Sequence, residues 1–187
     1  MLFRERWRSD TIKMVIYMKQ KTLKKIVLSG LFAAIISVAT LLSVPLPTGG
    51  FANFGDCFVI LSGIILGPVY SFFAAGIGSA LSDLFLGWAN YAPVTFLIKG
   101  IMALVAYHIA GRKENFGIIR CSVASITSEA IMICGYFCFE LMLYGAGAIA
   151  NLVGNGLQGI VGVVSAVSFS AVLNKTGLLN KIRKNCK

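Results

Sequence analysis

Charged side chains are scarce in this chain of 187 residues. They make up 13% of it, about half the usual share of a soluble domain, whereas 57% of the residues are hydrophobic and the mean hydropathy is +0.83. A soluble core of this size could not bury so much apolar surface, so the sequence predicts an integral membrane protein. No linker, low-complexity tract or second domain is evident, which favours a single compact membrane domain.

Motifs of several enzyme classes are also missing. The chain has no glycine-rich loop followed by Lys-Ser or Lys-Thr, so it is not expected to bind ATP in that way. It has no HExxH, GxSxG or paired-carboxylate motif, and its five cysteines follow no metal-ligand spacing. We therefore predict that the protein is not an enzyme and has no catalytic residues, metal site or cofactor.

The basic residues lie in clusters that flank apolar segments. Lys and Arg number 17 against 7 Asp and Glu, which gives a net charge of +10. Eight of them precede Val27, three lie within residues 112–120, five follow Asn174, and Lys99 lies elsewhere. This placement follows the positive-inside rule for membrane proteins and does not suggest a nucleic-acid-binding surface.

Apolar segments separated by turn-forming residues predict six transmembrane helices. The second is about 14 residues long, shorter than the roughly 20 of a straight span. Six spans nevertheless place all three basic clusters on one side of the membrane, whereas five would separate the middle cluster. The predicted fold class is an all-α, six-helix integral membrane bundle in the plasma membrane, with both termini cytoplasmic. The expected spans are residues 23–43, 53–66, 69–87, 94–110, 121–143 and 149–173.

This topology divides the chain into three parts. Residues 1–22 form a basic cytoplasmic extension, residues 23–174 the six-helix transmembrane domain, and residues 175–187 a basic cytoplasmic tail. Met18 opens MKQKTLKKIV, a natural start for a first membrane helix, so residues 1–17 are either an upstream extension or a disordered tail. They are not expected to be a cleaved signal peptide, because no small-residue cleavage site is evident.

Two opposite charges are expected at matched depth near the outer end of the bundle. Asp83 lies roughly 6 Å below the outer end of its helix, and Lys99 roughly 8 to 9 Å below the outer end of the next. Charges within lipid are costly unless paired, so we expect these two to form an ion pair. The pair either holds the helices together or forms the floor of an outward-facing pocket, and the two roles are compatible.

Further polar residues gather at the same end. Glu140 follows Tyr136 by one turn on the fifth segment. Asn151, Asn155 and Gln158 share one face of the sixth, where hydrogen bonds between helices are the alternative to a ligand.

Aromatic residues lie at the same end, and one further acidic residue lies deeper in the fifth segment. Trp88 and Tyr91 lie in the outer loop before the fourth segment, where interfacial aromatic residues are common. Together with the acid, base and amide groups, they predict an outward-facing pocket. Glu129 lies on the inner half of the fifth segment and is interpreted as structural or as part of a partner interface.

Small residues form a face on the first segment. Ser29, Ala33 and Ser37 recur every four residues, with Gly30 and Ala34 beside them. Such a face lets two helix backbones approach closely, either within the protein or against a partner helix.

The sequence also resembles a known family. Residues 47–100 read PTGGFANFGDCFVILSGIILGPVYSFFAAGIGSALSDLFLGWANYAPVTFLIKG, and two further matching stretches are residues 135–140 and 154–159. Over about residues 22–175 the chain is similar to the substrate-binding S components of energy-coupling factor (ECF) transporters. The nearest group is the riboflavin-type family, which includes hydroxymethylpyrimidine and pyridoxine carriers.

The resemblance implies a six-helix protein that captures a vitamin or vitamin precursor from outside. A transmembrane coupling subunit and two ATPases would be the partners that drive release inside. The family's small-residue face, which docks on the coupling subunit, corresponds here to Gly30–Ala34 or Ala33–Ser37. A pyrimidine or pyridine ligand is expected. Riboflavin, a membrane scaffold without transport function and a membrane enzyme are the alternatives.

Overall fold

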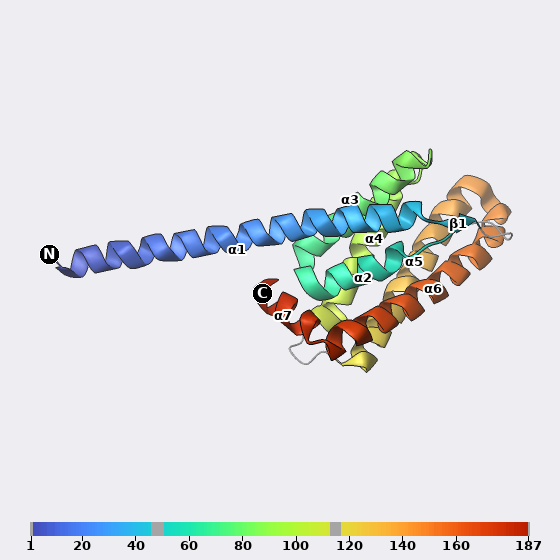
Figure 1. Cartoon of the computed structure of the whole chain (residues 1–187). Helices are drawn as coiled ribbons and strands as arrows, with labels where there is room; N and C mark the ends of the chain where they lie inside the picture. Colours follow the sequence, from blue (N-terminus) through green and yellow to red (C-terminus); the bar gives the residue numbers. More distant parts are fainter. Residues whose placement is uncertain (1, 46–50, 113–116, 187) are drawn as a thin grey trace.

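The computed structural model describes residues 2–45, 51–112 and 117–186, and these are almost entirely helical (Figure 1). Short 3-10 and π segments, η2 (Gly145–Gly147) and η1 (Tyr107–Gly111), and a two-residue strand pair, β1 (Val44–Pro45) and β2 (Phe51–Ala52), join or extend the helices. The helices are α1 (Leu2–Leu41), α2 (Gly55–Leu66), α3 (Pro68–Phe85), α4 (Ala92–Ala106), α5 (Ile118–Tyr144), α6 (Ala148–Lys175) and α7 (Leu178–Cys186).

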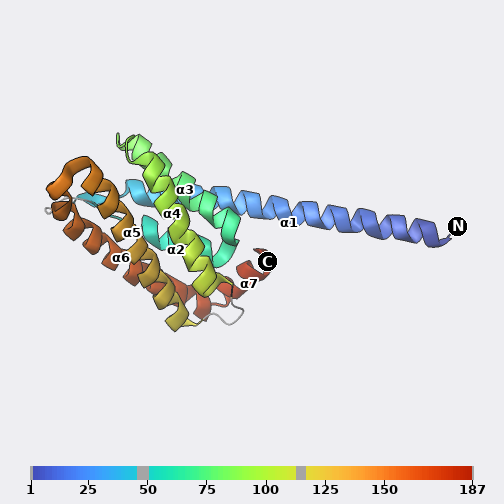
Figure 2. The same ribbon diagram turned by 180° about the vertical axis from the view of Figure 1, so that it is seen from behind.

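Helices α1 to α6 correspond to the six predicted segments. Their ends are shifted by a few residues, except that α1 begins 21 residues before the predicted start at residue 23. Three stretches are long and apolar enough to cross a membrane: Met18–Leu41, Ala92–Gly111 and Ile118–Lys175. The last contains both α5 and α6, which pack side by side and are joined by the tight turn at η2 (Figures 1 and 2). Pro68 at the start of α3 and Gly67 before it, with a φ of 92°, explain why α2 and α3 are separate helices.

The short helix α2 is the centre of the bundle. At 12 residues it rises about 18 Å, less than the roughly 30 Å of a bilayer core. It is buried along almost its whole length and contacts α1, α3, α4 and α6. Gly63 permits a close contact with α4, because a Cβ there would lie 2.3 Å from the Ala103 carbonyl oxygen. Helix α2 is therefore a core element enclosed by longer helices.

The outer surfaces of the longer helices are apolar. Val27 and Val38 on α1, Phe73 on α3, Ile126 on α5 and Val164 on α6 are each at least 45% exposed. Soluble proteins rarely expose apolar surface on several sides of the molecule. The arrangement agrees with a multi-pass membrane protein, in which lipid covers these side chains.

Helices extend towards both ends of the chain. Helix α1 begins at Leu2 and projects beyond the other helices, so residues 2–17 continue the first helix (Figures 1 and 2). The expected C-terminal tail contains α7. Leu179 of α7 is fully buried, and Arg183 donates to the Gly111 carbonyl oxygen at 2.8 Å, which satisfies an end group of η1.

Candidate ligand-binding pocket

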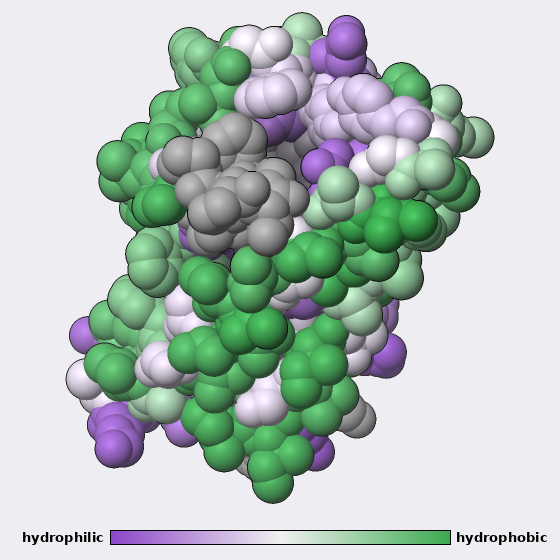
Figure 3. Space-filling model, turned by 90° about the vertical axis from the view of Figure 1, so that its right-hand side faces the viewer, coloured by the Kyte–Doolittle hydropathy of each residue, from purple (hydrophilic) through white to green (hydrophobic). Residues whose placement is uncertain are grey.

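A pocket of about 230 Å³ opens at the end of the bundle where α1 ends and where α5 turns into α6. Figure 3 looks onto this end and shows hydrophilic and intermediate residues gathered around a hollow, with hydrophobic residues over the surrounding helices. Helices α1, α3, α4, α5 and α6 all contribute to the wall. The lining residues are Thr40, Ser43, Asn53, Ser79, Asp83, Leu86, Trp88, Tyr91, Thr95, Lys99, Tyr136, Glu140, Tyr144, Asn151, Asn155 and Gln158.

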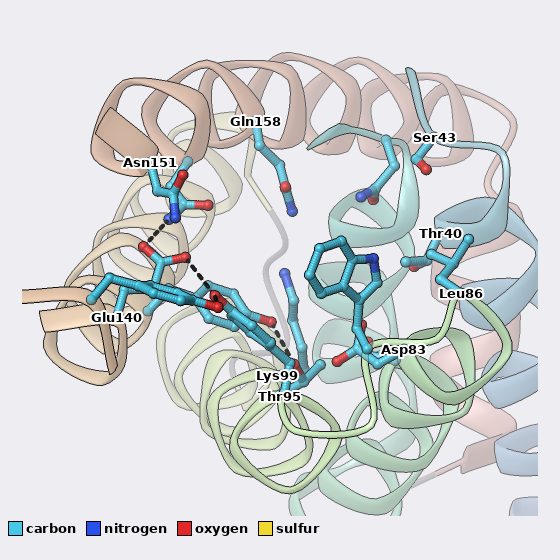
Figure 4. Close-up of a pocket in the computed structure, with 16 residues that line it drawn as sticks. Thr40, Ser43, Asp83, Leu86, Thr95, Lys99, Glu140, Asn151 and Gln158 are labelled. Atoms are coloured by element: carbon cyan, nitrogen blue, oxygen red, sulfur yellow. Dashed lines mark hydrogen bonds between the residues drawn. The ribbon is translucent and has the colours of Figure 1, made fainter. Parts of the chain in front are cut away.

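All nine side chains that the sequence indicated as substrate-binding candidates line this one pocket. They come from segments up to 75 residues apart, Asp83 to Gln158, and the fold brings them together. In Figure 4, Glu140 and Asn151 lie on one side of the pocket and Asp83 and Thr95 on another, while Lys99 and Gln158 point towards its centre. Their contact with a ligand remains a prediction.

The floor of the pocket is an ion pair that the sequence analysis assigned incorrectly. Lys99 pairs with Asp56 of α2, not with Asp83. Both partners are almost fully buried, Lys99 at 5% exposed and Asp56 at 1%. Gln158 donates from Nε2 to the second oxygen of Asp56 at 2.7 Å, so both carboxylate oxygens are satisfied.

The sequence did not identify Asp56 as a partner of Lys99. Asp56 lies in the first turn of a short apolar helix, where an ionisable side chain is costly unless it has a partner. That cost was the signal that could have identified it. Matched depth suggested Asp83 as the partner of Lys99, but the rotation of α2 in the core aims Asp56 at Lys99 instead.

One wall of the pocket is built around Glu140. Its carboxylate accepts from the Tyr91 hydroxyl and from the Asn155 amide, each at 3.5 Å. Burial raises the pKa of Tyr91, which lies in the loop before α4, so this hydroxyl stays protonated and donates. Asn151 lies beside the same carboxylate. The amide face predicted on α6 is therefore directed into the pocket.

Aromatic rings cover part of the pocket. The rings of Trp88 and Tyr91 meet edge to face with centroids 5.9 Å apart, and Tyr91 also contacts the ring of Phe139 in this way at 5.2 Å. The Lys99 ammonium lies 5.6 Å from the centre of the Tyr136 ring. The pocket thus offers flat apolar faces next to a few polar groups, which suits a small planar ligand.

Residues 20–175 match the family of ECF-type riboflavin transporter S components. The chain belongs to this family. As a transporter component it is not an enzyme, as the missing motifs indicated. The S component is 30% identical over 143 residues to an uncharacterised protein of Pyrococcus woesei encoded in the gap 3′ region, covering 75% of this chain and 95% of that protein.

A second relative of the S component has a described role. It is the thiamine precursor transporter HmpT of Lactococcus lactis subsp. cremoris (strain MG1363), 30% identical over 171 residues. The match covers 89% of this chain and 98% of that protein. The family match over residues 20–175 includes every residue that lines the pocket.

One part of the small-residue face of α1 packs against α3, and another part is exposed. Ser82 of α3 donates to the Ser37 backbone carbonyl at 3.1 Å, and a Cβ at Gly78 would lie 2.5 Å from the Ala33 carbonyl oxygen. Ala33 and Ser37 thus pack against α3 within the protein. Gly30 and Ala34 are exposed on the same helix, and nothing lies within 4 Å of a Cβ built at Gly30. Ser29 is half-buried and donates to the Lys25 carbonyl oxygen.

Glu129 lies outside the pocket, in the core between α5 and α6. It is 3% exposed, and neither carboxylate oxygen has a hydrogen-bond partner among the described residues. Its side chain fills the space beside Gly162, where a Cβ would lie 2.0 Å from Oε1. The structural role considered for Glu129 agrees with this packing.

Proposed function

We propose that this S component captures a small vitamin precursor, a pyrimidine related to hydroxymethylpyrimidine, from outside the cell. The observation that carries the proposal is the pocket, in which all nine polar and aromatic candidates meet. The relative HmpT, whose name describes a thiamine precursor transporter, supports a ligand of this class. A pyridine such as pyridoxine has a similar size and is the neighbouring possibility.

The size of the pocket favours one ring over a flavin. Pockets for drug-sized ligands span about 300–1,000 Å³, and this one has about 230 Å³. A single six-membered ring with short substituents fits such a volume, whereas the three fused rings and sugar-alcohol chain of riboflavin are much larger. Riboflavin therefore becomes the weaker alternative, although it gives its name to the family.

The partners and the orientation follow from family membership and charge. A transmembrane coupling subunit and two ATPase subunits would drive release of the ligand inside. The basic clusters support an orientation with both termini in the cytoplasm and with the six-helix substrate-binding domain, residues 23–174, in the plasma membrane. The pocket then faces outwards.

The exposed part of the small-residue face is proposed as the contact with the coupling subunit. Gly30 and Ala34 lie one turn apart and are open, whereas Ala33 and Ser37 are occupied by α3. Ala34→Leu should therefore reduce co-purification of the coupling subunit and leave ligand binding intact. Ala33→Leu is the matched control, because it should disturb the packing of α1 on α3 and lower thermal stability. If the coupling subunit still co-purifies with both variants, this face is not the contact.

Calorimetric titration of the purified protein tests the ligand. Wild type should bind hydroxymethylpyrimidine more tightly than riboflavin, and Gln158→Leu should weaken that binding about five- to a hundred-fold. The chain alone in proteoliposomes should bind the ligand without accumulating it, since no nucleotide-binding motif is present. Binding of none of the pyrimidine, pyridine or flavin vitamins would refute the proposed function.

A further inference from the structure

Two polar atoms on the pocket-facing side of α3 have no hydrogen-bond partner in the part of the chain that the structure describes. Ser79 and Asp83 lie one helical turn apart, and both line the pocket. Ser79 is 2% exposed. Its Oγ atom and the Oδ2 atom of Asp83 are shielded from water and have no hydrogen-bond partner among the described residues. Buried polar atoms are rarely left without a hydrogen-bond partner. A ligand that supplies partners to these two atoms would therefore be favoured.

Several other polar groups of the pocket are engaged. Lys99 is paired with Asp56, and Glu140 accepts from two donors. Tyr136 donates to the Thr95 hydroxyl at 3.0 Å, and Thr95 in turn interacts with the Asp83 carboxylate. Oδ2 of Asp83 has no hydrogen-bond partner among the described residues. The buried, unsatisfied polar atoms of the described pocket lining therefore lie on one edge of α3.

We propose that Ser79 and Asp83, whose side chains rotate to open Oγ and Oδ2 to the cavity when ligand enters, form the recognition edge for an amino-substituted nitrogen heterocycle. The Asp83 carboxylate accepts a hydrogen bond from the exocyclic amino group, and the Ser79 hydroxyl donates to the neighbouring ring nitrogen. A 4-aminopyrimidine presents this donor and acceptor side by side, and residues one turn apart on a helix have Cβ atoms about 5–6 Å apart. The inference rests on the proposed function and names the residues that would select its ligand.

The charges of the pocket support a neutral or cationic ligand without phosphate. Lys99 is the one cationic side chain in the described lining, and Asp56 already neutralises it. Asp83 and Glu140 are both acidic and both face the cavity. A phosphate ester would meet two carboxyl groups and no available cation, so the free alcohol should bind far better than its phosphate.

The test compares two pyrimidines that differ in one edge. Calorimetry on the full chain in mild detergent would use 4-amino-5-hydroxymethyl-2-methylpyrimidine and its 4-oxo counterpart, in which a carbonyl and a ring N–H reverse the donor and acceptor. Wild type should prefer the amino compound at least about tenfold, because the oxo compound sets two acceptors against each other. The phosphate ester of the amino compound should bind weakest.

Variants separate recognition from folding. Asp83→Asn should lose about tenfold or more in affinity for the amino compound and should reduce the preference over the oxo compound, since an amide can also donate. Ser79→Ala should lower the affinity for the amino compound and reduce the preference for it over the oxo compound. Glu129→Gln is the matched control, because it neutralises a buried acid outside the pocket and should leave the amino-to-oxo ratio unchanged.

The possible results distinguish this inference from the proposed function. Equal binding of the two pyrimidines by wild type, or an unchanged ratio in Asp83→Asn, would overturn the inference. Binding of pyridoxine or riboflavin in preference to either pyrimidine would also overturn it and leave vitamin capture standing. Binding of no compound would refute both. If Asp83→Asn does not fold, the wild-type ratio and Ser79→Ala still decide.

Discussion

Separating Lys99 from Asp56 should be among the most damaging small changes to this protein. Lys99→Met keeps most of the volume and removes the charge, which leaves the Asp56 carboxylate almost fully buried with Gln158 as its remaining partner. Removing one member of a buried ion pair costs about 3–5 kcal/mol, because the other charge stays in a medium of low dielectric constant. For a chain of this length that corresponds to a fall in Tm of about 6–20 °C.

A second change should reverse most of that loss. Asp56→Asn in the same molecule removes the stranded charge and keeps an oxygen that can accept from Gln158. Neutral replacements of a whole buried pair are often tolerated, so the double variant should be more stable than either single variant. The expected coupling free energy is about 3 kcal/mol.

The measurement is a double-mutant cycle on thermal unfolding in detergent, followed by tryptophan fluorescence. The cycle of Lys99→Met with Asp83→Asn is the matched comparison, and its coupling should stay below about 1 kcal/mol because those residues do not pair directly. Additive effects at Asp56 and Lys99 would falsify the assignment of the pocket floor. A larger coupling at Asp83 than at Asp56 would restore the pair expected from depth alone.

Two further predictions concern packing. Gly63→Ala should destabilise the protein by about 1–3 kcal/mol in thermal unfolding, because the new Cβ would lie 2.3 Å from the Ala103 carbonyl oxygen, whereas Gly156→Ala, with nothing within 4 Å, should be neutral or stabilising. No difference between these two variants would contradict the close packing of α2 on α4. Arg183→Ala should speed hydrogen exchange throughout α7, because Arg183 holds that helix to the carbonyl groups at the end of η1. Lys181→Ala, at an exposed position of the same helix, should leave the exchange rates unchanged. Equal exchange in both variants would show that α7 is held by its apolar contacts alone.

The sequence determined the features that depend on local composition. Apolar runs between turn residues predicted six helices because a helix in lipid must satisfy its own backbone groups and present apolar side chains. The acidic, basic and amide residues of the pocket were identifiable because such groups are costly in lipid, and their positions along the segments put them near one end. The aromatic residues were identifiable from their places in the outer loop or one turn from Glu140. Distance along a helix converts directly into depth, so grouping by depth needs no knowledge of neighbours.

Tertiary structure decided everything that depends on how helices rotate and on which of them are adjacent. Depth alone made Asp83 the partner of Lys99, whereas the position of α2 in the centre brings Asp56 to it across 43 residues of sequence. The small-residue face of α1 likewise looked continuous, and packing on α3 divides it into an occupied and an exposed half. Side-chain type limits the possible partners of a buried charge, but helix rotation selects one, because only the partner that reaches it offsets the cost of burial.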